Sequence, residues 1–287
     1  MTKSLIIFIA IFIYLMPVSG KPLIVTTVKP LSDIVRSIGG DKVKVKYIIP
    51  PDVSLHFYEY KSSDIKAVFK ADLFIYIGSG EPNIDGILRN VRKEAVNISK
   101  VKGIYTIDHF DFTDDHEDHH SEIHPALWLH PLNGIKIGEF VYKKLCEIDS
   151  KNKDYYRKRY EKFRHDLERL YIEWKNKFKK VKNRYFISYH FTWPYFTQAF
   201  DLIYLDVVEI GHGREPTPKH ILEIIKKIKK YKIRSIFAAR QFYNEKYGRL
   251  IKENTNVKIV FLDPFGTDKD YIQMMRYNIE KVYRSLR

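Results

Sequence analysis

The chain carries metal-binding side chains at four places, each in a loop or directly after a predicted strand. His56 lies in the loop that follows one predicted strand, whereas His190 and Asp263 come directly after two others. Two further histidines, His124 and His130, flank a short Pro-bounded tract. Imidazole nitrogens and a carboxylate oxygen together form a ligand set that zinc accepts in tetrahedral geometry. The sequence therefore indicates a candidate site for a divalent metal ion.

Each of these residues taken alone is weak evidence, because a single His in a loop is more often structural or exposed. Their shared position is more informative. Ligands of open parallel sheets bind beyond the carboxyl ends of the strands. Side chains that follow strands in two halves of the chain can therefore meet in a cleft between those halves.

Short β-type runs alternate with helical patterns in both halves of the chain, which predicts βαβ units and parallel sheets covered by helices. The predicted strands are 23–28, 43–49, 73–77 and 104–107 in the first half and 185–189, 202–210, 233–238 and 257–262 in the second. The predicted helices include 31–38, 62–71, 85–90, one that starts at Pro218, and a terminal helix over 270–285.

Between the two halves, apolar residues recur at steps of three and four from Tyr156 to Val181 without Gly or Pro. This spacing predicts one long amphipathic helix. The predicted fold is therefore α/β, with two parallel-sheet lobes joined by one long rigid helix. The predicted divisions are residues 1–20, an N-terminal lobe over 21–150, the linking helix over 151–182, and a C-terminal lobe over 183–287.

The first twenty residues have the pattern of a secretory signal peptide. Lys3 precedes an apolar run over 5–18, which ends in Val18-Ser19-Gly20 with small residues at the cleavage positions. An uncleaved anchor is the alternative. No Cys follows the run, so we expect no lipid-modified N-terminus, and the only cysteine, Cys146, has no partner for an internal disulfide. We expect an exported, periplasmic protein.

The formal net charge of +15 raises the question of a nucleic-acid partner. However, the lysines are spread along amphipathic helices such as 218–230, where isoleucines form the buried face. Solvated Lys-rich helix surfaces are the commoner explanation, and we expect no nucleic-acid partner. Attraction to an anionic membrane surface stays open.

A series of segments along the whole mature chain is similar, in the same order, to one known family. These segments are 25–31, 38–43, 50–59, 71–73, 128–133, 186–190, 262–264 and 271–278. Together they resemble the metal-binding substrate-binding proteins of bacterial zinc and manganese ABC importers. The resemblance implies two α/β lobes bridged by a long helix, a transported Zn²⁺ (Mn²⁺ being possible), an ABC permease in the inner membrane as partner, and no enzymatic activity. We expect a monomer.

The resemblance also assigns ligands. It implies that His56 is the first metal ligand and His190 the third, and that Asp263 is the carboxylate that can complete the shell. Zinc-type members have His at the third position and manganese-type members often have Glu, so His190 favours zinc.

The second ligand is where this chain departs from the family, which usually reads Pro-His-x-Trp-Leu-Asp-Pro at this point. Here Ala126 stands in the ligand's place and His130 in that of the Asp. Because two histidines flank the lost one, we hypothesise that His124 or His130 takes its role. The competing interpretation is that the high-affinity site has been lost or relocated, leaving a metal-buffering or cell-adhesion module.

An acidic, His-rich loop over 108–124 has no apolar residues in its central tract 114–122, which predicts a surface loop. A solvated linker is the simpler interpretation. Family members of the zinc type often carry such a loop, which favours an accessory, low-affinity metal collector formed by His116, His119 and His120.

A secreted zinc hydrolase is a less favoured alternative. A catalytic zinc needs an open coordination position and a general base. The sequence contains neither His-Glu-x-x-His nor Gly-x-Ser-x-Gly nor a phosphate-binding loop.

Overall fold

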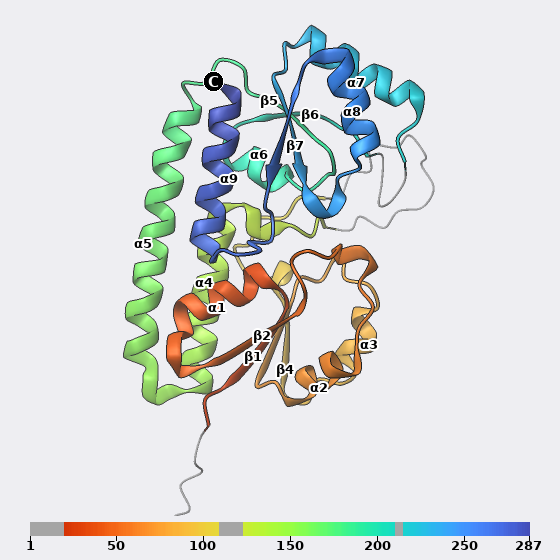
Figure 1. Ribbon diagram of the computed structural model, residues 1–287. Coiled ribbons are helices and arrows are strands. Elements are labelled where there is room, and N and C mark those ends of the chain that lie inside the picture. The colour runs from red at the N-terminus through yellow and green to blue at the C-terminus, as the bar shows by residue number, and fades with distance from the viewer. Residues whose placement is uncertain (1–19, 109–122, 210–214) are drawn as a thin grey trace, which may run out of the picture.

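The structure is a computed structural model, which describes residues 20–108, 123–209 and 215–287. Two four-stranded sheets form its two lobes, and every strand pair in them is parallel (Figure 1). The first sheet has the order β2-β1-β3-β4, with β1 at Leu23–Val28, β2 at Lys44–Ile49, β3 at Leu73–Tyr76 and β4 at Glu94–Asn97. The second has the order β6-β5-β7-β8, with β5 at Tyr185–Ser188, β6 at Ile203–Val207, β7 at Ser235–Ala239 and β8 at Lys258–Leu262.

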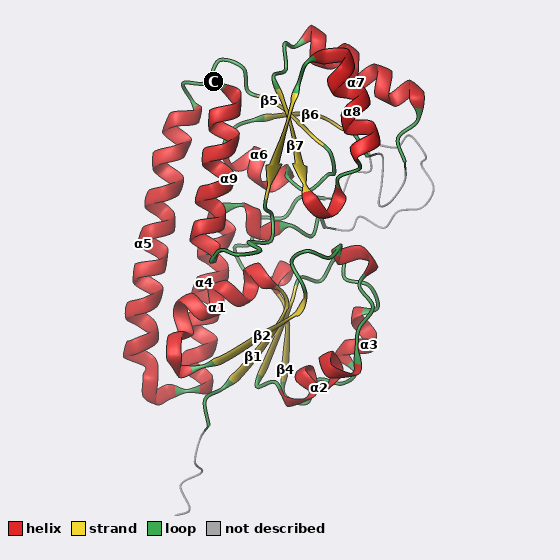
Figure 2. Cartoon of the chain, viewed as in Figure 1, coloured by secondary structure: helices red, strands yellow, loops and turns green. Residues whose placement is uncertain are grey.

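Helices surround both sheets (Figure 2). In the first half they are α1 at Lys29–Gly39, α2 at Ser62–Lys70, α3 at Ile84–Leu88 and α4 at Pro131–Ile148. The remaining helices are α5 at Lys153–Phe178, α6 at Pro194–Ala199, α7 at Pro218–Lys230, α8 at Glu245–Thr255 and α9 at Tyr271–Leu286. Within the described ranges, no helix is both long and apolar enough to span a bilayer.

Helix α5 runs along the side of both lobes (Figure 1). Its 26 residues give it a length of about 39 Å, at about 1.5 Å per residue. One stripe of the helix is buried against α1, α4 and α9, and the other faces solvent. The buried residues are Tyr156, Phe163, Leu167, Leu170, Trp174 and Phe178. The predicted fold class, two parallel-sheet lobes joined by a long helix, is confirmed.

The C-terminal helix α9 returns to the turn that precedes α4. The Tyr271 hydroxyl donates to the backbone carbonyl of Trp128 at 2.6 Å, and the Trp128 indole N–H donates to the Pro264 carbonyl at 2.8 Å. Both aromatic side chains are fully buried. A Cβ at Gly134 would lie 2.2 Å from the Tyr271 hydroxyl oxygen, so only glycine allows this approach. The two lobes are therefore joined by direct hydrogen bonds as well as by α5.

One predicted strand is wrong. Residues 104–107 form no strand, and the fourth place in the first sheet belongs to β4. Two backbone N–H groups of this segment bond to side chains instead: that of Tyr105 donates to the Asn133 side chain and that of Ile107 to the Tyr195 hydroxyl. The apolar run therefore packs against α4 and α6 rather than pairing with a neighbouring strand.

Replacing Tyr271 with Phe should lower the free energy of unfolding by about 1–2 kcal/mol, because the buried Trp128 carbonyl loses its donor. Denaturant unfolding monitored by fluorescence measures the change. Tyr277→Phe on the same helix, where the ring is only half-buried, is the matched control and should change stability by less than about 0.5 kcal/mol. Equal stability of the two variants would contradict this account of the lobe connection.

Candidate metal centre

Three histidines line one small cavity between the lobes. His56 belongs to a short 3-10 turn, Leu55–Phe57, after β2; His124 precedes α4; and His190 follows β5 by two residues. The cavity has a volume of about 20 Å³, which is room for a single water-sized species. Its remaining wall is mostly apolar and is formed by Leu55, Pro125, Ala126, Trp128, Phe191, Thr192, Phe242 and Phe265.

His56 is positioned by the burial of its neighbour Leu55, which is 2% exposed, and by the loop after β3. Gly80 in that loop has a φ of +73°, and a Cβ there would lie 3.2 Å from the His56 ring and 3.0 Å from Pro125. A side chain at this position would therefore both strain the backbone and press on the wall of the cavity.

His190 is oriented from two sides. Its Nδ1 lies 2.8 Å from a carboxylate oxygen of Glu209, and its ring stacks on Phe242 with centroids 4.1 Å apart. Because an ionised carboxylate only accepts hydrogen bonds, this contact assigns the proton to Nδ1. Nε2 then carries the lone pair that a metal ion requires. The His56 ring lies opposite, with its centroid 6.2 Å from that of His190.

Sequence reasoning missed Glu209. A carboxylate that accepts a hydrogen bond from a metal-binding imidazole fixes its tautomer and raises its basicity. The available signal was only that Glu209 lies near the end of the predicted strand 202–210, while His190 directly follows the predicted strand 185–189. That signal does not pair the two residues, because the pairing depends on the register of β5 against β6.

His124 connects the lobes. Its Nε2 donates to the Phe191 carbonyl at 2.7 Å, and its Nδ1 accepts a longer bond, 3.3 Å, from the Ala126 N–H. The side chain is buried, and the Tyr195 hydroxyl donates to its backbone carbonyl at 3.1 Å. Both ring nitrogens are therefore engaged in this conformation, and one of the two bonds must open before His124 can ligate a metal.

Consistent with this, the described residues contain no group of three His, Cys, Asp or Glu side chains already arranged to hold a metal ion. The three imidazoles line one cavity without yet pointing at one centre. The Thr192 hydroxyl in the cavity wall is buried and has no hydrogen-bond partner among the described residues. A metal-bound water is a species that this hydroxyl could bond.

The structure does not bring His130 to this cavity. Its Nδ1 accepts from the Leu132 N–H and so caps the N-terminus of α4, and the ring lines a different pocket beside Gln198. Burial, with a smaller effect of the nearby Lys175 charge, lowers the pKa of His130 to about 4. This histidine therefore performs the capping role for which Asp is also suited.

Asp263 also lies outside the cavity, in a separate pocket near Arg240. Its carboxylate accepts hydrogen bonds from the backbone N–H groups of Phe265, Gly266 and Thr267, so it braces its own loop. That loop places Phe265 in the cavity wall. His116, His119 and His120 lie outside the described residues.

Comparison with known proteins gives the family. The model of the zinc-uptake complex component A, periplasmic (ZnuA), matches residues 24–285. The chain belongs to the ZnuA family. Its members are metal-binding substrate-binding proteins of ABC importers, as the resemblance implied.

Relatives within and around the ZnuA family differ in the metal that they carry. The manganese ABC transporter substrate-binding lipoprotein PsaA of Streptococcus pneumoniae is 25% identical over 293 residues, covering 93% of this chain and 90% of PsaA. A Zn(II)-bound variant of AdcAII from Streptococcus pneumoniae is similar with a TM-score of 0.80 and 25% identity, covering 94% and 100% of the two chains. The laminin-binding protein Lmb of Streptococcus agalactiae, described as an adhesin with metal-transporting activity, has a TM-score of 0.77, 25% identity and coverage of 93% and 100%.

His124→Ala should lower the zinc affinity by more than about tenfold, because it removes an imidazole from the cavity. His130→Ala should leave the affinity within about twofold but lower the unfolding free energy by about 1 kcal/mol through loss of the α4 cap. Competition with a chromophoric chelator and denaturant unfolding measure the two effects. Unchanged affinity in the double variant would exclude both histidines.

Glu209→Ala should lower the zinc affinity about 10–100-fold by releasing the His190 ring. Glu209→Gln should recover most of this loss, since the amide oxygen can still accept from Nδ1–H. The absorption spectrum of the Co²⁺ form reports the ligand geometry separately from stability. Glu223→Ala, at an exposed position of α7, is the control. If Gln and Ala at position 209 behaved alike, Glu209 would not act through this hydrogen bond.

Proposed function

We propose that this chain captures a divalent transition-metal ion, zinc in preference to manganese, between its lobes and delivers it to an ABC importer. The observation that carries the proposal is the interlobe cavity lined by His56, His124 and His190. Imidazole ligands suit zinc, whereas manganese favours carboxylate, carbonyl and water oxygens. The cargo ion enters as substrate, and the importer's permease is the partner that receives it.

The binding step is local. His190 presents Nε2 because Glu209 holds the proton on Nδ1, and His56 faces it across the cavity. His124 must exchange its bond to Phe191 or to Ala126 for the ion. We propose that a water beside Thr192, or Asp263 after release of its loop, completes a four-coordinate shell.

The cavity and the sequence together favour a carrier over a hydrolase. A volume of about 20 Å³ suits a single ion or water, and the sequence contains neither His-Glu-x-x-His nor Gly-x-Ser-x-Gly. The adhesion alternative is supported by similarity to laminin-binding streptococcal proteins and by no feature of the cavity, so it stays a prediction. The proposal also includes export through the leader 1–20 and action as a monomer. It divides the chain into lobes at 21–150 and 183–287, joined by a helix at 151–182. It further assigns collection of metal ions to the loop 108–124.

The deciding experiment is a metal titration of chelator-stripped protein, residues 21–287, with zinc and manganese in competition. We expect tight 1:1 zinc binding, weaker manganese binding, and a loss of zinc affinity of more than about 100-fold in His190→Ala. His165→Ala, an exposed histidine on α5, is the matched control and should bind as the wild type. Weak, multiple binding that is indifferent to His190 would refute the interlobe site.

A further inference from the structure

A second charged feature lies far from the metal cavity, at the other end of the C-terminal lobe. Three segments, 179–185, 229–235 and 284–287, contain ten Lys and Arg residues and no Asp or Glu. Over the whole chain, by contrast, Lys and Arg outnumber Asp and Glu only 50 to 35. We call these three segments the basic pole. Its cations are Lys179, Lys180, Lys182, Arg184, Lys229, Lys230, Lys232, Arg234, Arg284 and Arg287.

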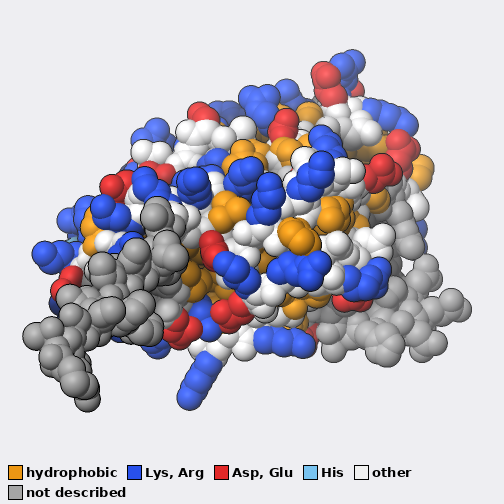
Figure 3. All heavy atoms as spheres, turned by 90° about the horizontal axis from the view of Figure 1, so that it is seen from below, with side chains coloured by type: hydrophobic (Ala, Val, Ile, Leu, Met, Phe, Trp, Pro, Cys, Tyr) orange, Lys and Arg blue, Asp and Glu red, His pale blue; other side chains and the backbone are white. Residues whose placement is uncertain are grey.

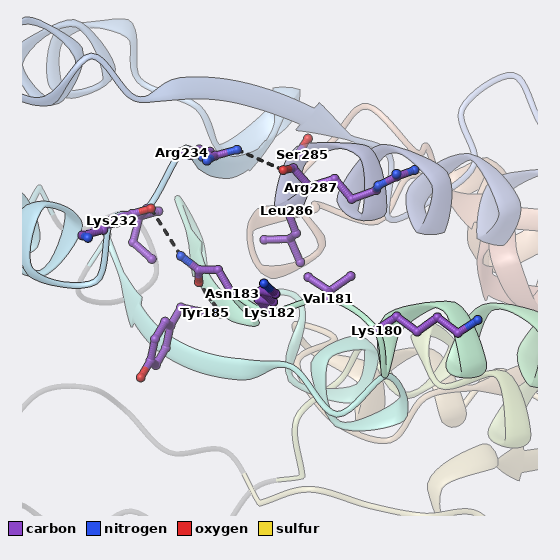
Figure 4. Close-up of a pocket in the computed structure, with 11 residues that line it drawn as sticks. Lys180, Val181, Lys182, Asn183, Tyr185, Lys232, Arg234, Ser285, Leu286 and Arg287 are labelled. Atoms are coloured by element: carbon purple, nitrogen blue, oxygen red, sulfur yellow. Dashed lines mark hydrogen bonds between the residues drawn. The ribbon is translucent and has the colours of Figure 1, made fainter.

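The three segments meet in space. Residues from all of them line one hollow of about 480 Å³, shown in Figure 4. The side-chain amide of Asn183 donates to the carbonyls of Tyr231 and Lys232, and Arg234 donates to the Arg287 carbonyl. Of the ten cations, Arg284 also forms an ion pair with Glu280 at 3.7 Å, while most of the others are exposed.

The basic pole faces away from the cavity. Its first two segments lead into β5 and β7, so they lie at the amino ends of these strands, whereas His190 follows the carboxyl end of β5. A strand of five residues spans roughly 16 Å, at about 3.3 Å per residue. The ends of α5 and α9 lie at the same pole, at the top of Figure 1. A partner on this surface would therefore leave the metal cavity open.

Several lysines on other surfaces of the molecule are neutralised by acidic neighbours. On α4 and α5, Lys143 pairs with Glu139 and Lys162 with Asp166, each within one helical turn. The face seen in Figure 3 likewise shows Lys and Arg interspersed with Asp and Glu. At the basic pole, neighbouring like charges repel one another, and a polyanion would relieve that repulsion.

The directions of the side chains decide which kind of anion fits. In Figure 4 the Lys180 and Lys232 side chains point in opposite directions, and the Arg287 side chain points away from Arg234. Side chains that diverge in this way cannot all contact one phosphate group. They suit an extended surface with many separate negative charges, such as a bilayer that contains anionic phospholipid.

We infer that the basic pole docks the protein on an anionic phospholipid surface, with the metal cavity directed away from the pole. This goes beyond metal capture and adds a second, electrostatic contact with the membrane. It differs from insertion, because the contact uses exposed cations on loops and helix ends. The interaction should weaken as the ionic strength rises, since exposed charges are screened beyond about 8 Å at 0.15 M salt.

The test is co-sedimentation of residues 21–287, which contain every helix and strand named above, with vesicles of phosphatidylcholine alone or mixed with phosphatidylglycerol. The variant is Lys180→Gln/Lys182→Gln/Lys232→Gln. Its matched control is Lys66→Gln/Lys70→Gln/Lys102→Gln, which removes the same charge from exposed positions of the N-terminal lobe. Zinc affinity is measured on both, so that loss of metal binding is distinguished from loss of docking.

We expect binding to the mixed vesicles only, a fall in vesicle affinity of at least tenfold in the pole variant, and a fall of less than threefold in the control. Zinc affinity should stay at the wild-type value in both variants. Equal losses in the two triple variants would reduce the effect to net charge and overturn the assignment. So would absence of binding to the mixed vesicles, full competition by inorganic phosphate at matched ionic strength, or a preference for duplex DNA over vesicles.

Discussion

The burial of one face of α5 against both lobes is the constraint on which the rest of the structure depends. That stripe runs from Tyr156 to Phe178, and it fixes the distance between two sheets whose carboxyl ends face each other. The hydrogen bonds between Tyr271, Trp128 and Pro264 add a second connection, close to the cavity itself. Because these contacts are buried, separating the lobes widely would expose aromatic surface at a large cost in free energy.

Because α5 and the buried hydrogen bonds connect the lobes, we expect the conformational change on metal binding to lie mainly in side chains. The segment from His124 to Trp128 is held by the lobe connection at one end and by the Tyr195 hydroxyl at the other. Within it, the His124 ring is the part that can exchange one hydrogen bond for a metal bond without displacing a sheet. In the proposed binding step, loss of the bond to Phe191 would offset part of the coordination energy, which would favour reversible binding over permanent retention.

The sequence predicted the fold well where periodicity is strong. The limits of β1 and the existence of the long helix α5 follow from apolar spacing, although α5 spans Lys153–Phe178 rather than 151–182. The position of His190 follows from the end of β5. It failed at 104–107, because an apolar run does not reveal that the side chains of Asn133 and Tyr195 will take its backbone hydrogen bonds. The local pattern of apolar residues indicates which face of a segment can be buried. It does not indicate which distant side chains will form hydrogen bonds with the backbone of that segment.

The same limit governed the candidate site. Family resemblance and strand ends indicated His56 and His190, yet two flanking histidines were equivalent in sequence until the fold separated them. Position 130 begins a helix, where a side-chain acceptor is needed, whereas His124 lies in the turn that faces the other lobe. The sequence did not indicate the contact between Glu209 and His190, because that contact depends on the pairing of β5 with β6. The sequence thus supplies candidate metal ligands, whereas the groups that would hold those ligands in one tautomer and one orientation depend on tertiary structure.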